Sequence, residues 1–388
     1  MDSISDEVYQ DQILPHVSRT FALTIPQLPP ALRSAVTSAY LLCRIADTIE
    51  DEPALSPEET LLFLQEFKAA VYGNGDPVWL AREIDQRLTE RTLPAERDLV
   101  RHMDRIIRLM LKLEAPQRSA IQRCVDQMCY GMPHFQNLTS LRGLARSSDM
   151  DRYCYYVAGV VGEMLTELFC ANDAVTARQR PALRALAASF AQGLQMTNIL
   201  KDQWEDRTRG ACWLPQDVFA RHGVDLATLA PVPHDPGFAA GLQELIALAH
   251  AHLRNALAYT LLIPANQVGI RRFCLWAIGL AVLTLRKINA NPRFTAGAQV
   301  KVTRRAVFWT QVLTGLAVRN DRMLIRLFER AARGLPLAPA ADMAHPAQAA
   351  PDPGGQREAT TRFEPSAHRE AAAPPARPRR RSDGSAAP

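Results

Sequence analysis

Two aspartate pairs are spaced so that their acidic side chains share one helix face. Asp47 and Asp51 are four residues apart, and Asp202 and Asp206 repeat the spacing with Asn198 one turn earlier. In a helix such residues lie one above the other, where two like charges repel each other. Each pair therefore indicates either a hydrated helix end or a bound cation. Both pairs continue a mostly apolar run, and the recurrence of this pattern favours the cation.

Tyr40 and Arg44 extend the first of these faces. They precede Asp47 and Asp51 at offsets of four, three and four residues. Arg44 stands in an apolar run, where an unpaired guanidinium would be costly, so it pairs with an acid or awaits an anion. Hard oxygen ligands suit Mg²⁺, which uses one or two carboxylates, keeps waters and takes other ligands from phosphates. We therefore expect a Mg²⁺-bound diphosphate between two facing helices.

The elements that must position these side chains are predicted to be helices. Apolar residues recur at helical spacing, and no alternating strand pattern appears between residues 57 and 145. The breaks between helices are short, as in a compact helical fold. We expect an all-α fold with one catalytic domain over residues 1–335, in which residues 1–16 are a polar lead-in. Beyond the two aspartate stretches, helices are expected at 57–72, 78–88, 95–113, 116–132, 151–170, 237–262 and 272–286.

Glycines and tyrosines mark the helix expected over residues 151–170. Gly159 and Gly162 each cost ~1 kcal/mol relative to alanine inside a helix, which indicates close approach by another helix or a ligand. Tyr153 and Tyr156 have the spacing of ordinary aromatic core packing, and for Tyr156 we keep that interpretation.

Composition narrows the class of protein. The 388 residues carry a net charge of only +5, with basic residues scattered through the body, which argues against nucleic acid as a partner. Seven cysteines without a Cys-x-x-Cys pair argue against a zinc site or a disulfide framework. The acidic N-terminus does not resemble a signal peptide, so we expect a cytoplasmic protein.

No membrane-spanning segment is expected, but the C-terminus is compositionally distinct. The most apolar run has 13 uncharged residues between Arg272 and Arg286, short of the ~20 that span a bilayer. Residues 336–388 are rich in Ala, Pro and Arg and are expected to be a disordered tail. Their basic cluster at residues 377–381 could make a weak peripheral contact with the inner membrane surface.

Taken together, these stretches resemble the squalene and phytoene synthases, which are head-to-head prenyl transferases. Residues 47–51 and 198–206 match the two aspartate-rich motifs of that family. Agreement extends to residues 18–21 (Ser-Arg-Thr-Phe), to residues 153–162 (Tyr-Cys-Tyr-Tyr-Val-Ala-Gly-Val-Val-Gly) and to residues 213–215 (Trp-Leu-Pro). The resemblance covers about residues 17–309. Glu50 and the string at 153–162 look like squalene synthase more than phytoene synthase.

The resemblance implies a fold, a reaction and residue roles. The fold would be a single-domain isoprenoid synthase bundle around a central apolar cavity, acting as a monomer. Two farnesyl diphosphates would join to presqualene diphosphate, which NADPH would reduce to squalene for sterol or hopanoid biosynthesis. The catalytic residues would be Tyr153 and the four aspartates. Mg²⁺, or Mn²⁺ in its place, would be held by Asp47, Glu50, Asp51, Asn198, Asp202 and Asp206. Substrate would contact Ser18, Arg19, Phe21, Tyr40, Arg44, Gln195, Asn198 and Lys201, and NADPH would contact Phe273 and Lys301.

Two departures from the family pattern leave alternatives open. Ala211 stands where the family has a basic residue, so a diphosphate contact is lost or passes to Arg207 or Arg209. Residues 276–279 (Trp-Ala-Ile-Gly) replace a usual proline and glutamine, and no glycine-rich nucleotide motif supports NADPH binding. The alternatives are a phytoene or dehydrosqualene synthase, a synthase that stops at presqualene diphosphate, and a non-catalytic helical scaffold. The intact aspartates argue against the scaffold.

Overall fold

The protein is described by a computed structural model over residues 4–18, 20–136, 140–229 and 235–338. These residues form helices and short connections and contain no β-strand, which confirms the predicted all-α class. The described residues group into one compact unit. Arg19 and residues 339–388 lie outside the described part of the chain, so the predictions for Arg19 and for most of the tail are not tested.

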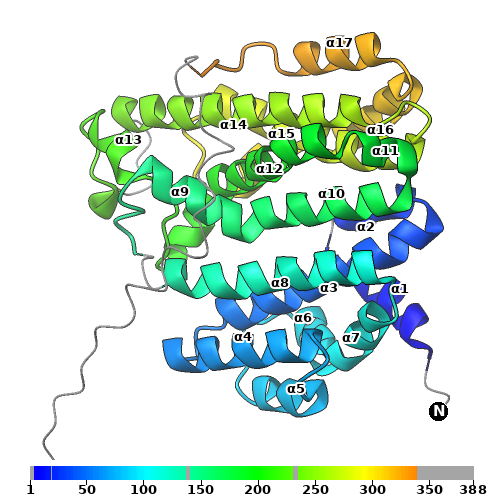
Figure 1. The fold of residues 1–388 in the computed structure, drawn as a ribbon. Helices are drawn as coiled ribbons and strands as arrows, with labels where there is room; N and C mark the ends of the chain where they lie inside the picture. The colour runs from blue at the N-terminus through cyan, green and yellow to red at the C-terminus, as the bar shows by residue number, and fades with distance from the viewer. Residues whose placement is uncertain (1–3, 19, 137–139, 230–234, 339–388) are drawn as a thin grey trace, which may run out of the picture. The chain divides into compact units, whose positions relative to one another are not determined.

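The first half of the chain contains two long helices, α3 and α8, and several shorter ones (Figure 1). Proline and acidic residues begin several of them. Ser56 and Glu59 form a reciprocal cap at the start of α4, which satisfies two free backbone N–H groups. The helix expected over residues 95–113 is interrupted at His102 and forms two. The elements are α1 (Asp6–Val17), α2 (Phe21–Thr24), α3 (Pro30–Asp51), α4 (Pro57–Val71), α5 (Pro77–Asp85), α6 (Pro94–Arg101), α7 (Met103–Leu111) and α8 (Ala115–Gln136).

The second half is dominated by three long helices, α12, α14 and α15. The helix expected over residues 151–170 is present but contains one π-helical turn, Tyr155–Gly159, a feature frequent at functional sites. A short 3₁₀ turn, Gly297–Val300, precedes the last two helices. The elements are α9 (Ser147–Cys154), α10 (Val160–Asn172), α11 (Ala174–Arg178), α12 (Arg180–Thr208), α13 (Gln216–Ala220), α14 (Pro236–Leu262), α15 (Val268–Ala290), α16 (Arg304–Ala317) and α17 (Asp321–Ala331).

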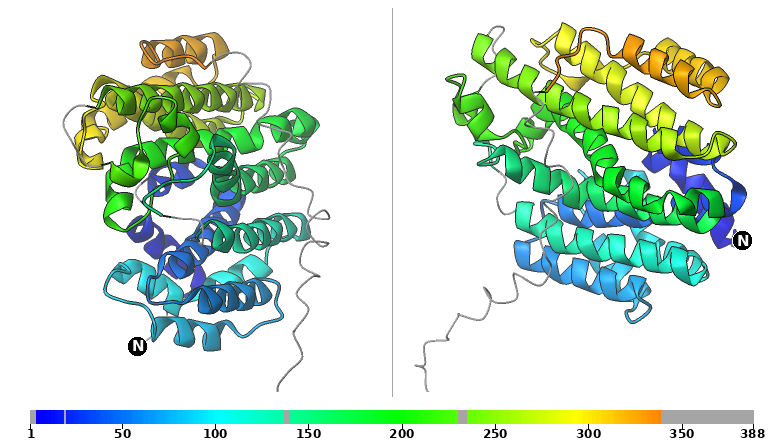
Figure 2. Two further views of the ribbon diagram at one scale, coloured as in Figure 1. Left: turned by 90° about the vertical axis from the view of Figure 1, so that its left-hand side faces the viewer. Right: turned by 45° about the horizontal axis from the view of Figure 1, so that its top comes forward.

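Helix α10 joins the two halves of the core, because it packs on α3 and α8 on one side and on α12 on the other. Helix α12 in turn packs on α14 and α15 (Figure 2). A Cβ atom at Gly162 would lie 2.2 Å from the carbonyl oxygen of Ala187 on α12. Only glycine permits this approach of α10 to α12, so the expectation of a close helix contact at Gly162 is confirmed.

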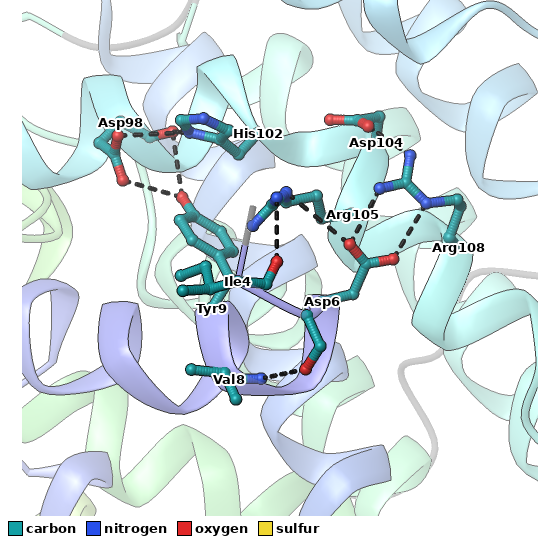
Figure 3. A network of polar contacts seen from close by, with 10 residues as sticks. Ile4, Asp6, Val8, Tyr9, Asp98, His102, Asp104, Arg105 and Arg108 are labelled. Carbon is teal, nitrogen blue, oxygen red and sulfur yellow. Dashed lines mark hydrogen bonds and ion pairs between the residues drawn. The ribbon is translucent and has the colours of Figure 1, made fainter. Parts of the chain in front are cut away.

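The expectation that residues 1–16 are only a polar lead-in is wrong, because they contain α1. A polar network fastens this helix to α6 and α7 (Figure 3). The Tyr9 hydroxyl donates to a carboxylate oxygen of Asp98 at 2.9 Å, and Arg108 donates to both oxygens of Asp6 at 3.0 Å. The weak amphipathic pattern of α1 gave little signal in the sequence. The network fixes the first half of α1 against α6 and α7.

Two helical stretches among the described residues are long and apolar enough to cross a membrane, judged by length and composition alone. They are Ser147–Asn172 and Val268–Ala290. In the fold, 56% and 61% of their most apolar windows are buried, as in core helices of a packed domain. All seven cysteines are buried thiols.

Candidate active site

The predicted face of α3 is the part of that helix that stays accessible. Every residue from Ala35 to Glu50 is buried except Tyr40, Arg44 and Asp47, and Asp51 follows one turn later as an exposed residue. Neighbouring helices cover the rest of α3. The spacing of four, three and four residues therefore identified a solvent-accessible stripe on an otherwise buried helix.

Arg44 holds this stripe together electrostatically. Its guanidinium lies 3.8 Å from Asp47 and 3.8 Å from Glu96 at the start of α6, and it donates to the Tyr40 hydroxyl at 3.4 Å. Its Nε is buried without a hydrogen-bond partner. The sequence left two alternatives for Arg44, pairing with an acid or binding an anion. Its guanidinium has acidic neighbours, and its Nε–H is a buried donor that an anion could use. Glu96 was not identified from the sequence.

Aromatic side chains form the wall below this stripe. The ring of Phe21 lies 5.0 Å from that of Tyr40 and 6.3 Å from that of Phe273, measured between centroids. The Tyr40 hydroxyl donates to the carbonyl of Val17 at 3.0 Å, which ties α3 to the end of α1. The Ser18 hydroxyl oxygen accepts a hydrogen bond from the backbone N–H of Phe21, the first residue of α2, at 3.0 Å. Its predicted contact with substrate stays a prediction.

On α12 the second predicted face is also largely accessible. Asn198 is exposed, and Gln195, Lys201 and Asp202 are partly accessible, whereas Asp206 is buried. The Lys201 ammonium lies 2.9 Å from an Asp202 carboxylate oxygen. The backbone of the Gly297 turn packs against this helix. Four of the five predicted α12 residues therefore remain open to a ligand.

The two aspartate pairs face each other closely enough to interact. The charge of Asp51 contributes to the raised pKa of Asp206, although burial is the larger cause. Arg209 forms an ion pair with Asp206, and its charge acts on both Asp51 and Asp202. Residues about 150 positions apart in sequence are thus brought near each other, and the charge of one guanidinium acts on both pairs.

Burial raises the pKa of the α3 carboxyl groups. For Asp47 the pKa rises to about 6, because desolvation and the charge of Asp51 outweigh the opposing charge of Arg44. The pKa of Glu50 is also raised, because Glu50 is buried and adjoins Asp51 and Asp47. Ionised carboxylates in this arrangement lower the stability of the fold, and a bound cation would offset their burial and mutual repulsion.

The donor set fits a hydrated Mg²⁺ better than a preformed protein cage. Among the described residues, no three His, Cys, Asp or Glu side chains converge as a ready metal site. Two pairs of carboxylates on facing helices are the arrangement that Mg²⁺ accepts when phosphates and waters complete its shell. Buried Asp206 already pairs with Arg209, so the accessible Asp47, Asp51, Asn198 and Asp202 are the nearest candidates. The six-residue ligand set stays a prediction.

Tyr153 lies beside these carboxylates, as the predicted catalytic role requires. Burial and the neighbouring Glu50 raise the pKa of its phenol, so the hydroxyl stays protonated at neutral pH. Its ring stacks on Trp213 with centroids 3.9 Å apart and planes inclined by 4°. Tyr156 instead packs against Tyr130 and Phe135, which confirms its assignment to the core.

The two basic residues near Ala211, Arg207 and Arg209, make different contacts. Arg207 donates to the carbonyls of Leu141 and Leu229 at 3.1 and 2.8 Å and so fastens two loops. Arg209 is 60% exposed and adjoins the acidic residues. Of the two alternatives for the missing diphosphate contact, this geometry favours Arg209.

The two residues predicted to bind NADPH differ in exposure. Phe273 is 3% exposed and packs against Phe21 and Phe169, so it belongs to the aromatic wall. Lys301 is exposed just after the Gly297 turn. In the unusual stretch at 276–279, a Cβ atom at Gly279 would lie 2.5 Å from Thr310 on α16, so this glycine allows α16 to approach α15.

Comparison with known proteins agrees with this arrangement. The family model for squalene/phytoene synthase matches residues 14–306, which include both aspartate pairs and Tyr153. The chain belongs to the squalene/phytoene synthase family. The solved structure of TcSQS with a bound ligand matches the fold with a TM-score of 0.68 and 24% identity, covering 84% of this chain and 91% of that one. A dehydrosqualene synthase structure matches with a TM-score of 0.58 and 18% identity, covering 83% and 97%.

The similar curated proteins are squalene synthases. That of Eremothecium gossypii is 28% identical over 292 residues, which cover 73% of this chain and 62% of the relative. That of Rattus norvegicus is 28% identical over 294 residues, which cover 75% of this chain and 65% of the relative. The chain thus spans about three fifths of the length of the first of these relatives.

Proposed function

We propose that the chain is a Mg²⁺-dependent squalene synthase that joins two farnesyl diphosphates head to head. One observation carries the proposal. Between Ala35 and Glu50 of α3, the accessible residues are Tyr40, Arg44 and Asp47. This stripe continues to Asp51, whose charge acts on Asp206 of α12. A non-catalytic scaffold has no use for two facing carboxylate pairs that cost stability.

The protein's own cations would bind and orient the diphosphate. Arg44 offers a buried N–H without a partner, and Lys201 and Arg209 place positive charge beside the second pair. Charge-assisted hydrogen bonds from such donors are about twice as strong as neutral ones. When bound, Mg²⁺ would neutralise the diphosphate and make it a better leaving group.

The aromatic wall and Tyr153 suit the carbocation that follows. Loss of diphosphate leaves an allyl cation, which needs a surface without nucleophiles. Phe21 and Tyr40 are partly accessible aromatic residues, and the faces of such rings attract cations. Tyr153 stays protonated beside Glu50, so its hydroxyl can pass a proton between product and carboxylate. We propose that this pair assists proton removal in the first half-reaction.

The reductive half-reaction rests on family membership, in which Mg²⁺ and NADPH are the usual cofactors. Lys301 is accessible for a cofactor phosphate, and buried Phe273 would shape the pocket from behind Phe21. We further propose that the protein acts as a cytoplasmic monomer. A light-scattering mass of one chain in solution would support the monomer.

Product analysis tests the proposal. Purified protein is incubated with farnesyl diphosphate and Mg²⁺, with and without NADPH, and the lipids are identified by mass spectrometry. We expect presqualene diphosphate without NADPH and squalene with it. Unchanged product on adding NADPH would remove the reductive half. Consumption of geranylgeranyl diphosphate alone would indicate phytoene synthesis, and no diphosphate release from either substrate would refute catalysis.

A further inference from the structure

Helix α16 is packed unlike the other long helices. Only Ala317 of its 14 residues is buried, whereas α15 beneath it buries 12. It packs mainly on α15 and on α17, which lies at the outer edge of the described residues beyond α14 (Figure 1). Four of its large apolar side chains are exposed, by 43–77%: Phe308, Trp309, Leu313 and Leu316.

These apolar side chains form a continuous face. At about 100° per residue the four side chains fall within an arc of about 140°, in which Leu316 lies beside Trp309 and Leu313 follows Trp309 by one turn. Trp309 and Leu313 also line an apolar cavity of about 290 Å³ between α14, α15, α16 and α17. Exposed apolar faces that adjoin an open apolar cavity usually mark a binding surface.

The surroundings of this face are strongly basic. Residues 297–335 contain eight Lys and Arg against two acidic residues, while the whole chain has a net charge of only +5. Arg304 and Arg305 are exposed at the start of α16, and Arg319 is exposed just after its end. One of the two acidic residues, Asp321, is bound to buried Arg271 at 2.6 Å. The positive charge near the apolar face is therefore largely uncompensated.

We propose that α16 is an interfacial helix that docks this domain on an anionic lipid surface. Aromatic and aliphatic side chains would enter the headgroup boundary, and Arg304, Arg305 and Arg319 would meet lipid phosphates. A second copy is a poorer occupant, because a twofold contact would bring the same basic residues together. Residues 339–388 are also a poorer match, because their seven arginines nearly balance six acidic residues.

Vesicle flotation of the full chain tests the proposal. The vesicles contain phosphatidylcholine alone or equal parts of phosphatidylcholine and phosphatidylglycerol. We expect binding to the anionic vesicles that weakens as salt rises. The double variant Arg304→Gln/Arg305→Gln should lower the partition coefficient roughly 30-fold, at ~1 kcal/mol for each arginine. Phe308→Ser/Leu316→Ser should lower it by at least ~10-fold.

Matched controls separate this surface from general effects. Leu61→Ser/Leu62→Ser removes two leucines of 46% and 48% exposure on α4 and should leave vesicle binding unchanged. Because all these side chains are exposed, thermal midpoints should stay close to wild type. A second readout does not require the double variants. The fluorescence emission of Trp309, obtained as the difference between wild type and Trp309→Phe, should shift to the blue when anionic vesicles are added.

Three results would overturn the proposal. Wild-type protein that ignores anionic vesicles would remove the lipid partner. Undiminished binding of both α16 variants would assign the contact to another part of the chain, such as the basic cluster at residues 377–381. A concentration-dependent dimer that Leu316→Ser dissolves, without vesicle binding, would identify a second copy as the occupant. Lipid docking by α16 does not depend on the proposed reaction, so the absence of either activity would leave the other unaffected.

Discussion

Asp47→Asn should stabilise the ligand-free protein while lowering its activity. Burial raises the pKa of Asp47 from 3.8 to about 6, net of the favourable charge of Arg44. Each pKa unit is worth about 1.4 kcal/mol, so the ionised carboxylate costs at most ~3 kcal/mol at neutral pH. The side chain is 32% accessible, so we discount this figure for solvent screening to ~1–2 kcal/mol.

The sign of the pH dependence follows from the direction of that rise. Because the folded-state pKa is the higher, the folded protein binds more protons than the unfolded chain between pH 4 and 6. Stability from this group is therefore lost as pH rises through that window. The asparagine variant lacks the titration, so its advantage should be largest above pH 6 and about half as large at pH 5.

Thermal unfolding without Mg²⁺ measures the effect. At pH 7.5 the midpoint of Asp47→Asn should exceed that of wild type by about 2–4 °C, and Asp11→Asn on the exposed side of α1 serves as the control. Mg²⁺ with inorganic diphosphate should raise the wild-type midpoint more than that of the variant, because the variant has lost a carboxylate. A lower midpoint for the variant, or the same increase at pH 5 and 7.5, would refute the reasoning.

Three further predictions concern other parts of the chain. Arg209→Gln should raise the KM for farnesyl diphosphate about 10-fold with little change in thermal midpoint. Arg207→Gln should instead lower the thermal midpoint. Equal KM values for the two variants would contradict the assignment of the diphosphate contact to Arg209. Arg271→Met should cost ~3–5 kcal/mol in chemical denaturation, because this buried guanidinium binds three backbone carbonyls and Asp321. Truncation after Leu337 should leave the midpoint unchanged, since the His250 contact with the Pro336 carbonyl is kept, and a clear drop would show that the removed segment docks.

The amino-acid sequence alone determined the helical class and the two faces that carry the candidate chemistry. Helical periodicity is a local property, so offsets of four, three and four residues placed Tyr40, Arg44, Asp47 and Asp51 on one stripe without knowledge of the fold. Gly162 likewise indicated a close helix contact, because the absence of a side chain in a helix costs stability that packing must recover.

Only the tertiary structure decided what lies opposite those faces. That the charge of Arg209 acts on both Asp51 and Asp206, and that the charge of Glu50 acts on Tyr153, depends on how α10 places α9 and α12 relative to α3. Helix α1 was missed because its apolar pattern is weak in the sequence, whereas its contacts with α3, α6 and α7 appear only in the folded chain. Spacing along a chain determines which side chains share a helix face, but packing between helices determines which charges meet across it.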